Sequence, residues 1–207
     1  MKRLLLLSIL SFSTLFAGAQ TRFGARAGVN LSKISFDYTD PNVVLDNQSV
    51  TSFQVGGYAE FKLLPKLFLQ PGLELSGHGN KIVEGQSEAK INLMYLKVPL
   101  NFGTRVGIGL GSIAFGAGPY FAYALSGKSS SGGQEADIKF GDAQDDELKR
   151  TDIGLNAFST YQLPIGLNFT LGYQMGLSNN VPSALASQIK AKNSSINFSI
   201  GYAIKLP

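Results

Sequence analysis

Hydrophobic and polar residues alternate along most of this chain with a period of two. In residues 167–178, Leu, Phe, Leu, Tyr, Met and Leu occupy every second position, with Asn, Thr, Gly, Gln, Gly and Ser between them. This is the period of a β-strand, whose successive side chains point to opposite faces. One face is large and apolar and the other is small, polar and uncharged, unlike the charged outer face of a soluble sheet. The segment therefore predicts a barrel strand with its apolar face in lipid and its polar face toward the lumen.

The same alternation recurs in seven other segments. Long polar loops and short turns alternate between them, and both chain ends fall on the side of the short turns. An even strand number with this asymmetry is typical of bacterial outer-membrane barrels. The sequence thus predicts an all-β fold, an eight-stranded antiparallel up-and-down transmembrane β-barrel with long external loops and short periplasmic turns. We expect strands at 22–32, 50–63, 67–76, 91–102, 113–125, 152–162, 167–178 and 194–206, long loops at 33–49, 77–90, 126–150 and 179–192, and turns at 64–66, 103–111 and 163–166.

Two expected strands contain an irregularity. In the fourth, Ile91, Leu93 and Tyr95 share one phase, and from Leu96 the apolar residues take the other, which predicts a β-bulge near residues 95–96. In the fifth, Pro119 lacks an N–H group and predicts a missing ladder bond or a local kink. The Gly-rich connection 103–111 is expected to be the longest turn on its side.

The amino terminus predicts export. Lys2 and Arg3 precede an apolar stretch at 4–16 and an Ala-Gly-Ala sequence at 17–19, the pattern of a secretory signal peptide cleaved before Gln20. An uncleaved membrane anchor is the alternative, but the apolar run is short for a span. We expect residues 1–19 to be removed and residues 20–207 to form a single outer-membrane β-barrel domain.

Charge and cysteine content limit the partners and the sources of stability. Loss of Lys2 and Arg3 from the 18 basic residues leaves 16 against 14 acidic ones, a net charge of about +2, so nothing indicates nucleic-acid binding. The chain has no cysteine, so packing and closure of the sheet must stabilise it.

Charged residues also occur in the phase that faces the lumen. An eight-stranded barrel is just wide enough for its own side chains, and unpaired buried charges are costly. We therefore expect these groups to pair across the lumen and to block a continuous water path. Asp152, near the outer rim, is expected to need a basic partner. The set is Arg26, Glu60, Lys62, Glu74, Lys97, Asp152 and Lys205.

Aromatic residues are frequent in the opposite phase, where they are expected to form the interfacial girdles that fix the depth of a barrel in the membrane. The alternative is a soluble barrel with these residues inward around a small ligand, which would leave a surface poor in charge. The set is Phe23, Phe53, Phe61, Phe102, Phe115, Phe121, Tyr123, Tyr161, Phe169, Tyr173 and Phe198.

Patterns that suggest enzyme chemistry are weak. Glu74, Ser76 and His78 share one strand face, as in a hydrolase site, but that face is the lumen and the spacing is poor for a nucleophile and its base. Gly107, Gly109 and Gly111 lack the helix and acidic residue of a dinucleotide site. The acidic cluster at 142–147 does not match an EF-hand loop. We expect no catalytic, cofactor-binding or metal site.

Six pieces of the chain, in order, resemble one family. The more specific are Tyr-Leu-Lys-Val-Pro at 95–99 and Ala-Gly-Pro-Tyr at 117–120. The chain is similar to the outer-membrane β-barrel domain labelled "porin family" or PorT-like in Bacteroidetes-type bacteria. The resemblance implies an outer-membrane location and permits an accessory role in a secretion or gliding apparatus. The other pieces lie at 23–32, 69–75, 151–155 and 171–178.

These observations together favour a small, monomeric, non-enzymatic outer-membrane barrel surrounded by outer-membrane lipid. We expect it to act in membrane integrity or in loop-mediated interaction, with a protein partner at the longest loop, from Ser126 to Arg150. The alternatives are an accessory component of a secretion or gliding apparatus and a narrow solute or ion channel.

Overall fold

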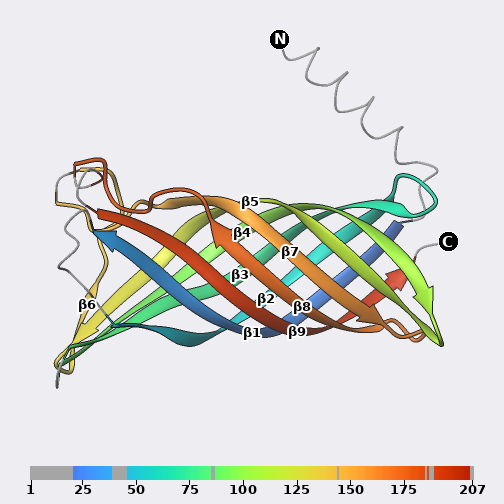
Figure 1. Ribbon diagram of the computed structural model, residues 1–207, viewed down its shortest axis with the longest axis horizontal. Helices are drawn as coiled ribbons and strands as arrows, with labels where there is room; N and C mark the ends of the chain where they lie inside the picture. The colour runs from blue at the N-terminus through green and yellow to red at the C-terminus, as the bar shows by residue number, and fades with distance from the viewer. Residues whose placement is uncertain are drawn as a thin grey trace, which may run out of the picture.

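The structure is a closed barrel of antiparallel β-strands (Figure 1). The computed structural model describes residues 21–38, 46–84, 87–143, 145–184, 186 and 189–205, so the expected signal peptide at 1–19 lies outside the described residues. No helix among these residues is long and apolar enough to cross a bilayer. The strands are β1 (Thr21–Tyr38), β2 (Asp46–Lys62), β3 (Leu67–Glu84), β4 (Ser87–Ile108), β5 (Gly111–Ser131), β6 (Gln134–Asp137), β7 (Thr151–Gln162), β8 (Leu167–Gly176) and β9 (Ile189–Lys205).

Eight of these strands form the ring. Each pairs with its neighbours in the order β4-β3-β2-β1-β9-β8-β7-β5, and the pairing of β4 with β5 closes the barrel. In the described chain, the short strand β6 pairs with β5 alone and forms a hairpin beyond the ring. In Figure 1 the start of β1, the end of β9 and the short turns lie at one end, here named the turn end. The opposite, loop end carries the longer connections. The predicted eight-stranded up-and-down barrel is confirmed.

The strands are longer than the sequence pattern indicates. β3 and β4 remain paired to Glu84 and Ser87, so most of the expected loop 77–90 is strand. At the turn end, β4 and β5 pair as far as Ile108 and Gly111. The expectation that 103–111 is the longest turn there is wrong. Its Gly-rich part still alternates, with Thr, Val and Ile outward at every second position, so it continues the sheet until Gly109, whose φ of +55° starts the reversal.

The irregularity expected in β4 lies in β5. Met94 pairs with Ser126 and Tyr95 with Ala124, so the unpaired extra residue is Leu125. β4 keeps one phase throughout, and Leu93 and Tyr95 are inward and only 3% and 2% exposed. Their expected outward orientation is wrong because the lumen becomes apolar toward the loop end. β5 continues through Pro119, which pairs with Leu155 and faces outward.

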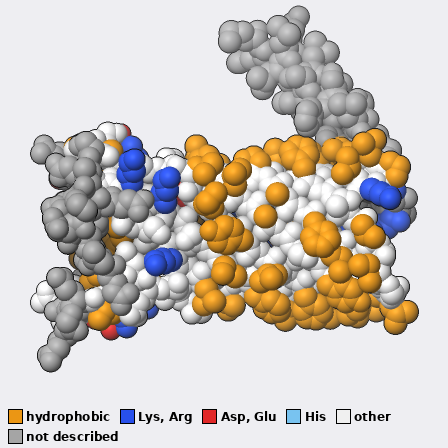
Figure 2. Space-filling view, viewed as in Figure 1, with side chains coloured by type: hydrophobic (Ala, Val, Ile, Leu, Met, Phe, Trp, Pro, Cys, Tyr) orange, Lys and Arg blue, Asp and Glu red, His pale blue; other side chains and the backbone are white. Residues whose placement is uncertain are grey.

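The outer surface carries a broad apolar band. Figure 2 shows hydrophobic side chains covering the half of the barrel near the turn end, with Lys and Arg side chains beyond the band. Leu171 and Phe198 on this face are 58% and 48% exposed, which excludes a soluble barrel with these residues inside. Of the expected interfacial aromatics, Phe61 is partly buried, and those on the outer face with large exposed areas are Phe23, Phe53, Phe102, Phe115, Phe121, Tyr123, Tyr161, Phe169, Tyr173 and Phe198. Their role as girdles remains a prediction.

Candidate functional site

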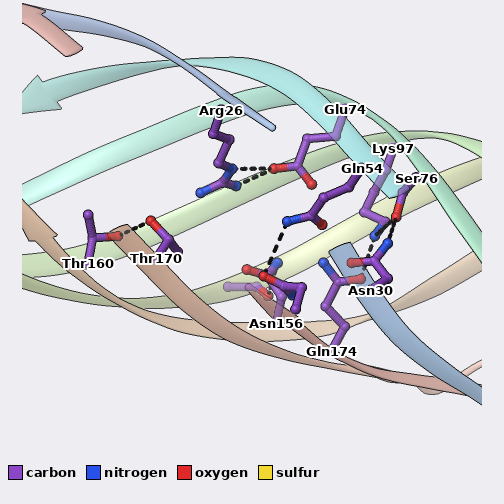
Figure 3. A network of polar contacts seen from close by, with 12 residues as sticks. Arg26, Asn30, Gln54, Glu74, Ser76, Lys97, Asn156, Thr160, Thr170 and Gln174 are labelled. Atoms are coloured by element: carbon purple, nitrogen blue, oxygen red, sulfur yellow. Dashed lines mark hydrogen bonds and ion pairs between the residues drawn. The ribbon is translucent and has the colours of Figure 1, made fainter. Parts of the chain in front are cut away.

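The lumen is filled by polar side chains at its centre, and its main ion pair joins β1 to β3 (Figure 3). Arg26 Nε donates to Glu74 Oε1 at 3.0 Å, and Nη2 donates to the same oxygen. The guanidinium carbon also lies 5.4 Å from the ring centre of Tyr58. Both charged side chains are largely buried, with relative exposures of 11% and 5%. A buried carboxylate bound in this way has its charge compensated.

Register explains how Arg26 and Glu74 meet although β2 lies between them. Arg26 pairs with Gly56, and Gly56 pairs with Glu74. A Cβ atom at Gly56 would lie 2.7 Å from Glu74 Cγ, so only glycine leaves room for this contact. The same row continues around the barrel, from Glu74 to Lys97, Lys97 to Ala122 and Ala122 to Asp152. Four of the seven expected lumen charges therefore share one row of paired residues.

Lys97, also on this row, is 1% exposed and bound by neutral groups. Its Nζ donates to Ser76 Oγ at 3.2 Å and to Gln174 Oε1, and lies 3.4 Å from His78 Nε2. It also lies 5.4 Å from the ring centre of Tyr120. None of the ion pairs in the described part of the chain includes Lys97. Hydrogen bonds and the ring of Tyr120 stabilise the ammonium group of Lys97, and Glu74 is its paired residue on β3.

Asp152 is buried at the loop end of the row and lacks the basic partner expected from the sequence. Tyr120 Oη and Asn193 Nδ2 donate to its Oδ2 at 3.1 and 3.0 Å, and Ser178 Oγ donates to Oδ1 at 2.6 Å. These three neutral donors satisfy the carboxylate, which is 3% exposed. No ion pair among the described residues includes it, so hydrogen bonding replaces the expected salt bridge.

A second ion cluster occupies the turn end of the lumen. Arg105 Nη2 donates to Glu60 Oε2 at 2.7 Å, and Arg22 Nη1 lies 3.7 Å from Glu60 Oε1. Both arginines also donate to Gln162 Oε1, at 3.0 Å from Arg105 and 3.3 Å from Arg22. Neither arginine is among the lumen charges expected from the sequence. Arg22 has the lumen phase of Arg26, which was an available signal, but Arg105 falls in the segment expected to be a turn.

Lys62 and Lys205, expected in the lumen network, lie at the exposed ends of β2 and β9. Neither forms an ion pair with another described residue. Both have the lumen phase, but the strands end there and water solvates the ammonium groups. They belong to the mouth of the barrel and not to its buried interior.

Two phenylalanine rings separate the ion clusters. Phe68, Ala114 and Phe158 form a buried apolar layer. Arg105 lies 5.8 Å from the Phe68 ring centre and Arg26 lies 6.0 Å from that of Phe158, so an arginine flanks each ring. This apolar layer therefore contacts both ion clusters through its rings.

Glycines on the neighbouring strands make space for these rings. A Cβ atom at Gly103 would lie 2.3 Å from the Phe68 ring, and one at Gly116 would lie 2.6 Å from the Phe158 ring. Gly103 in β4 and Gly116 in β5 therefore serve lumen packing.

The loop end is closed by a second apolar cluster. Inward residues of the strands, among them Ile34, Leu93 and Tyr120, pack with Ile138 and Leu148 from the segment between β6 and β7. Ile138 and Leu148 are both 6% exposed. The segment expected to be the longest polar loop, 126–150, is thus partly the end of β5 and the strand β6, and partly a plug over the barrel. Ile138 and Leu148 pack inward because the inward-facing strand residues at this end are apolar, and the contact removes apolar surface from water.

Hydrogen bonds link this plug to the segment between β8 and β9. Ser183 donates through its backbone N–H to Asp142 Oδ1 at 2.6 Å and through Oγ to Oδ2 at 2.9 Å. Lys149 Nζ lies 3.6 Å from Asp142 Oδ1 and donates to Ser183 Oγ at 3.2 Å. Asp142, weighed in the sequence as a calcium ligand, serves here as an acceptor between two loops. In the described chain, no group of three or more His, Cys, Asp or Glu residues could hold a metal ion.

Ser76 and His78 do not form a hydrolase site with Glu74. Ser76 Oγ lies 3.2 Å from His78 Nε2, but Glu74 binds Arg26, and His78 Nδ1 has no hydrogen-bond partner among the described residues. Ser76 is 0% exposed, so a lipid substrate has no access to it. In a catalytic triad a carboxylate accepts a hydrogen bond from the second ring nitrogen of the histidine, and Glu74 does not do so here.

A closed antiparallel ring of this size, with an apolar outer band and a polar lumen, defines the class of outer-membrane β-barrels. A family model described as "Outer membrane protein beta-barrel domain" matches residues 17–182. The chain belongs to this family of outer-membrane barrels, which lie in membrane lipid. The turn end is accordingly periplasmic and the loop end extracellular.

Solved structures of outer-membrane proteins are similar in fold. OprG of Pseudomonas aeruginosa is 14% identical, with 91% of this chain and 98% of that chain covered and a TM-score of 0.51. Ail, the attachment invasion locus protein of Yersinia pestis, is 12% identical, with 89% of this chain and 99% of that chain covered and a TM-score of 0.46. No curated protein matches the sequence.

Proposed function

We propose that this protein is a closed, non-enzymatic and monomeric barrel that holds an extracellular β-structure in place for contact with a partner and contributes to membrane integrity. The observation that carries this proposal is the filling of the lumen at successive levels. The Arg105–Glu60 cluster, the Phe68 layer, the Arg26–Glu74 pair and the plug containing Leu148 follow one another along the barrel. An eight-stranded barrel has no spare width beside such side chains.

Conductance tests the closed lumen and separates this proposal from a solute or ion channel. The purified protein in planar bilayers is expected to give no stable conductance steps, while a general porin reconstituted in parallel gives them. Steps like those of the porin would contradict the proposal. The variant Phe68→Ala with Phe158→Ala serves as a second measurement, because the plug at Leu148 is expected to keep even this barrel closed.

The contact surface is the hairpin of β5 and β6. All four residues of β6 are exposed, and β6 pairs only with β5 in the described chain, so its other edge is open. An open edge can accept a strand from a partner. The one ion pair described on the hairpin, Lys128 with Glu135, is exposed at 3.4 Å and leaves the edge free.

Removal of the hairpin tip tests this surface. Replacement of residues 132–137 by a short Gly-Ser turn is expected to abolish crosslinks to any extracellular partner in whole cells, while heat-modifiable migration on a gel shows that the barrel still forms. A matched change in the periplasmic turn 163–166 is the control. Unchanged crosslinks in the hairpin variant would contradict the proposed contact surface.

One observation favours a second candidate, an accessory role in a secretion or gliding apparatus. It is the resemblance of residues 95–99 and 117–120 to PorT-like barrels. A strain that lacks the protein is expected under this candidate to lose secretion of the substrates of that apparatus. Normal secretion in the deletion strain would remove it.

The absence of enzyme activity has its own test. Ser76→Ala and His78→Ala are expected to leave the membrane lipid profile unchanged, because both side chains are buried in the lumen. A changed lipid profile in both variants, with the barrel intact, would contradict this part of the proposal.

A further inference from the structure

The periplasmic mouth of the barrel carries a marked excess of positive charge. A cavity of about 300 Å³ opens there, and the charged residues that line it are Arg22, Lys62, Lys66 and Arg105 against the single carboxylate of Glu60. Lys205 and Arg22 line the adjoining depression. Other described acidic groups lie elsewhere, for example Glu74 beyond the Phe68 layer. The mouth therefore holds more cations than its own carboxylate can neutralise.

The contacts of Glu60 show the same imbalance in detail. Arg105 takes both carboxylate oxygens, with Nη2 at 2.7 Å from Oε2 and Nε at 3.3 Å from Oε1. Arg22 Nη1 lies farther away, 3.7 Å from Glu60 Oε1, and donates a hydrogen bond to the neutral acceptor Gln162. Its side chain is 28% exposed and faces the cavity. Two guanidinium groups thus share one carboxylate, and a second anion at the cavity would relieve their repulsion.

The direction of these side chains distinguishes a site in the mouth from contact with membrane headgroups. Arg22, Lys62 and Arg105 have the phase of the lumen-facing residues on their strands, so they project into the opening and not toward the lipid around the barrel. Lys66, from the turn between β2 and β3, lines the same cavity. The cations therefore line one cavity that is open to the periplasmic side.

Apart from Gly107 and Ser112, the remaining lining of the cavity is apolar. Leu64, Pro65 and Leu67 contribute the lip, and Phe68 closes the inner end. A volume of about 300 Å³ lies at the lower end of the range for small-molecule sites. Such a cavity admits a small molecule with an apolar part and an anionic group, and it excludes a folded domain.

We propose that the periplasmic mouth is a binding site for a small organic anion, whose carboxylate or phosphate group is held by Arg22, Lys62 and Lys66. Arg105 belongs to the wall of the site, because Glu60 already binds it. This site lies at the opposite end of the barrel from the proposed contact surface on β5 and β6, and it stands independently of that function.

The test is an NMR titration of the full barrel in detergent micelles, first with inorganic phosphate and succinate as probes. Saturable shifts of the backbone amides of Gly107 and Ser112, which line the cavity, are expected. Because a charge about 4 Å from an anion contributes about fivefold in affinity even in bulk water, the double variant Lys62→Gln with Lys66→Gln is expected to raise Kd at least about tenfold. Both lysines are exposed, so the variant should fold, as heat-modifiable migration will show.

The control variant is Lys33→Gln with Lys192→Gln, which removes the same charge from the other end of the barrel and is expected to leave Kd unchanged. A separate arm uses a short-chain phosphatidylglycerol as the probe. Shifts with this lipid alone would assign the site to a membrane headgroup and overturn the proposal of a soluble anion. Non-saturable shifts, or equal loss of affinity in both double variants, would overturn the site itself.

Discussion

Arg26 on β1 binds Glu74 on β3 across the backbone of Gly56 on the strand between them. The contact joins two strands that are not neighbours and fills the centre of the lumen (Figure 3). It exists because the three residues share one row of the register and because the middle one has no side chain.

A first prediction concerns Gly56. A Cβ atom there would lie 2.5 Å from the backbone oxygen of Leu73 and 2.7 Å from Glu74 Cγ, so Gly56→Ala is expected to lower the free energy of unfolding by about 1–3 kcal/mol. Gly57→Ala is the matched control, since its nearest atom would be at 3.5 Å, and it should change stability by less than about 0.5 kcal/mol. Urea unfolding in lipid vesicles measures both. Equal effects would contradict the role of Gly56 as a spacer.

A second prediction concerns the charge of Glu74. Glu74→Gln leaves the buried Arg26 without its carboxylate and is expected to reduce the free energy of unfolding by about 3–5 kcal/mol. The double variant Arg26→Met with Glu74→Leu should lose less, because no unpaired charge remains. Glu135→Gln, which breaks an exposed pair, should cost at most about 1 kcal/mol. A double variant less stable than Glu74→Gln would refute this account.

A third prediction concerns the plug at the extracellular end. Leu148→Ala removes a buried side chain from the apolar cluster and is expected to destabilise that segment by about 2–4 kcal/mol while the ring of strands stays folded. Trypsin should then cut whole-cell protein at Lys139, Lys149 or Arg150, as detected by mass spectrometry. Leu177→Ala, on the outer face and 49% exposed in the native barrel, is the control that should remain uncut. Resistance of Leu148→Ala to trypsin would show that the plug does not depend on this residue.

A fourth prediction is a pH effect at the link between the two extracellular segments. Hydrogen bonds from the backbone and side chain of Ser183, with the charge of Lys149, lower the pKa of Asp142. A lowered pKa means that the link stabilises the folded loops above the ordinary pKa of the carboxyl group, and that this contribution disappears as the pH falls below about 4.

The amide signal of Ser183 in an NMR pH titration reports this link, since that amide donates to Asp142. The signal is expected to move below about pH 4 in the native protein, and Asp142→Asn should abolish the movement. Asp145→Asn is a matched exposed control that should leave it intact. If the Ser183 amide titrates identically in Asp142→Asn, its signal does not depend on the ionisation of Asp142, and the prediction is contradicted.

The phase of the residues predicted much of the lumen but not its pairing. Arg26, Glu60, Glu74, Lys97 and Asp152 all face inward, as the alternation indicates. Which of them meet depends on register between strands far apart in sequence, and a period of two carries no information about register. Lys97 on β4, for instance, binds Gln174 on β8, and Asp152 on β7 binds Asn193 on β9, so neither of these partners lies on a neighbouring strand.

Leu93 and Tyr95 illustrate where the alternation was misleading. Their side chains are apolar, which in this barrel predicted the lipid face, yet they pack inward with Leu148 under the plug. The rule that apolar residues face lipid applies only within the band of the bilayer. Beyond it the barrel needs an interior core like that of a soluble protein, and the local pattern does not show where the band ends.

The sequence by itself determined the strand period, the number of strands in the ring, the orientation of the apolar band and the asymmetry between turns and loops. These properties are local, because side-chain direction in a strand follows from backbone geometry and turn residues mark its ends. Only the tertiary structure decided that Arg26 reaches Glu74 over Gly56, that Arg22 and Arg105 share Glu60, and that Leu148 closes the barrel. Those contacts depend on closure of the ring between β4 and β5 and on one register around it, and both are properties of the whole sheet.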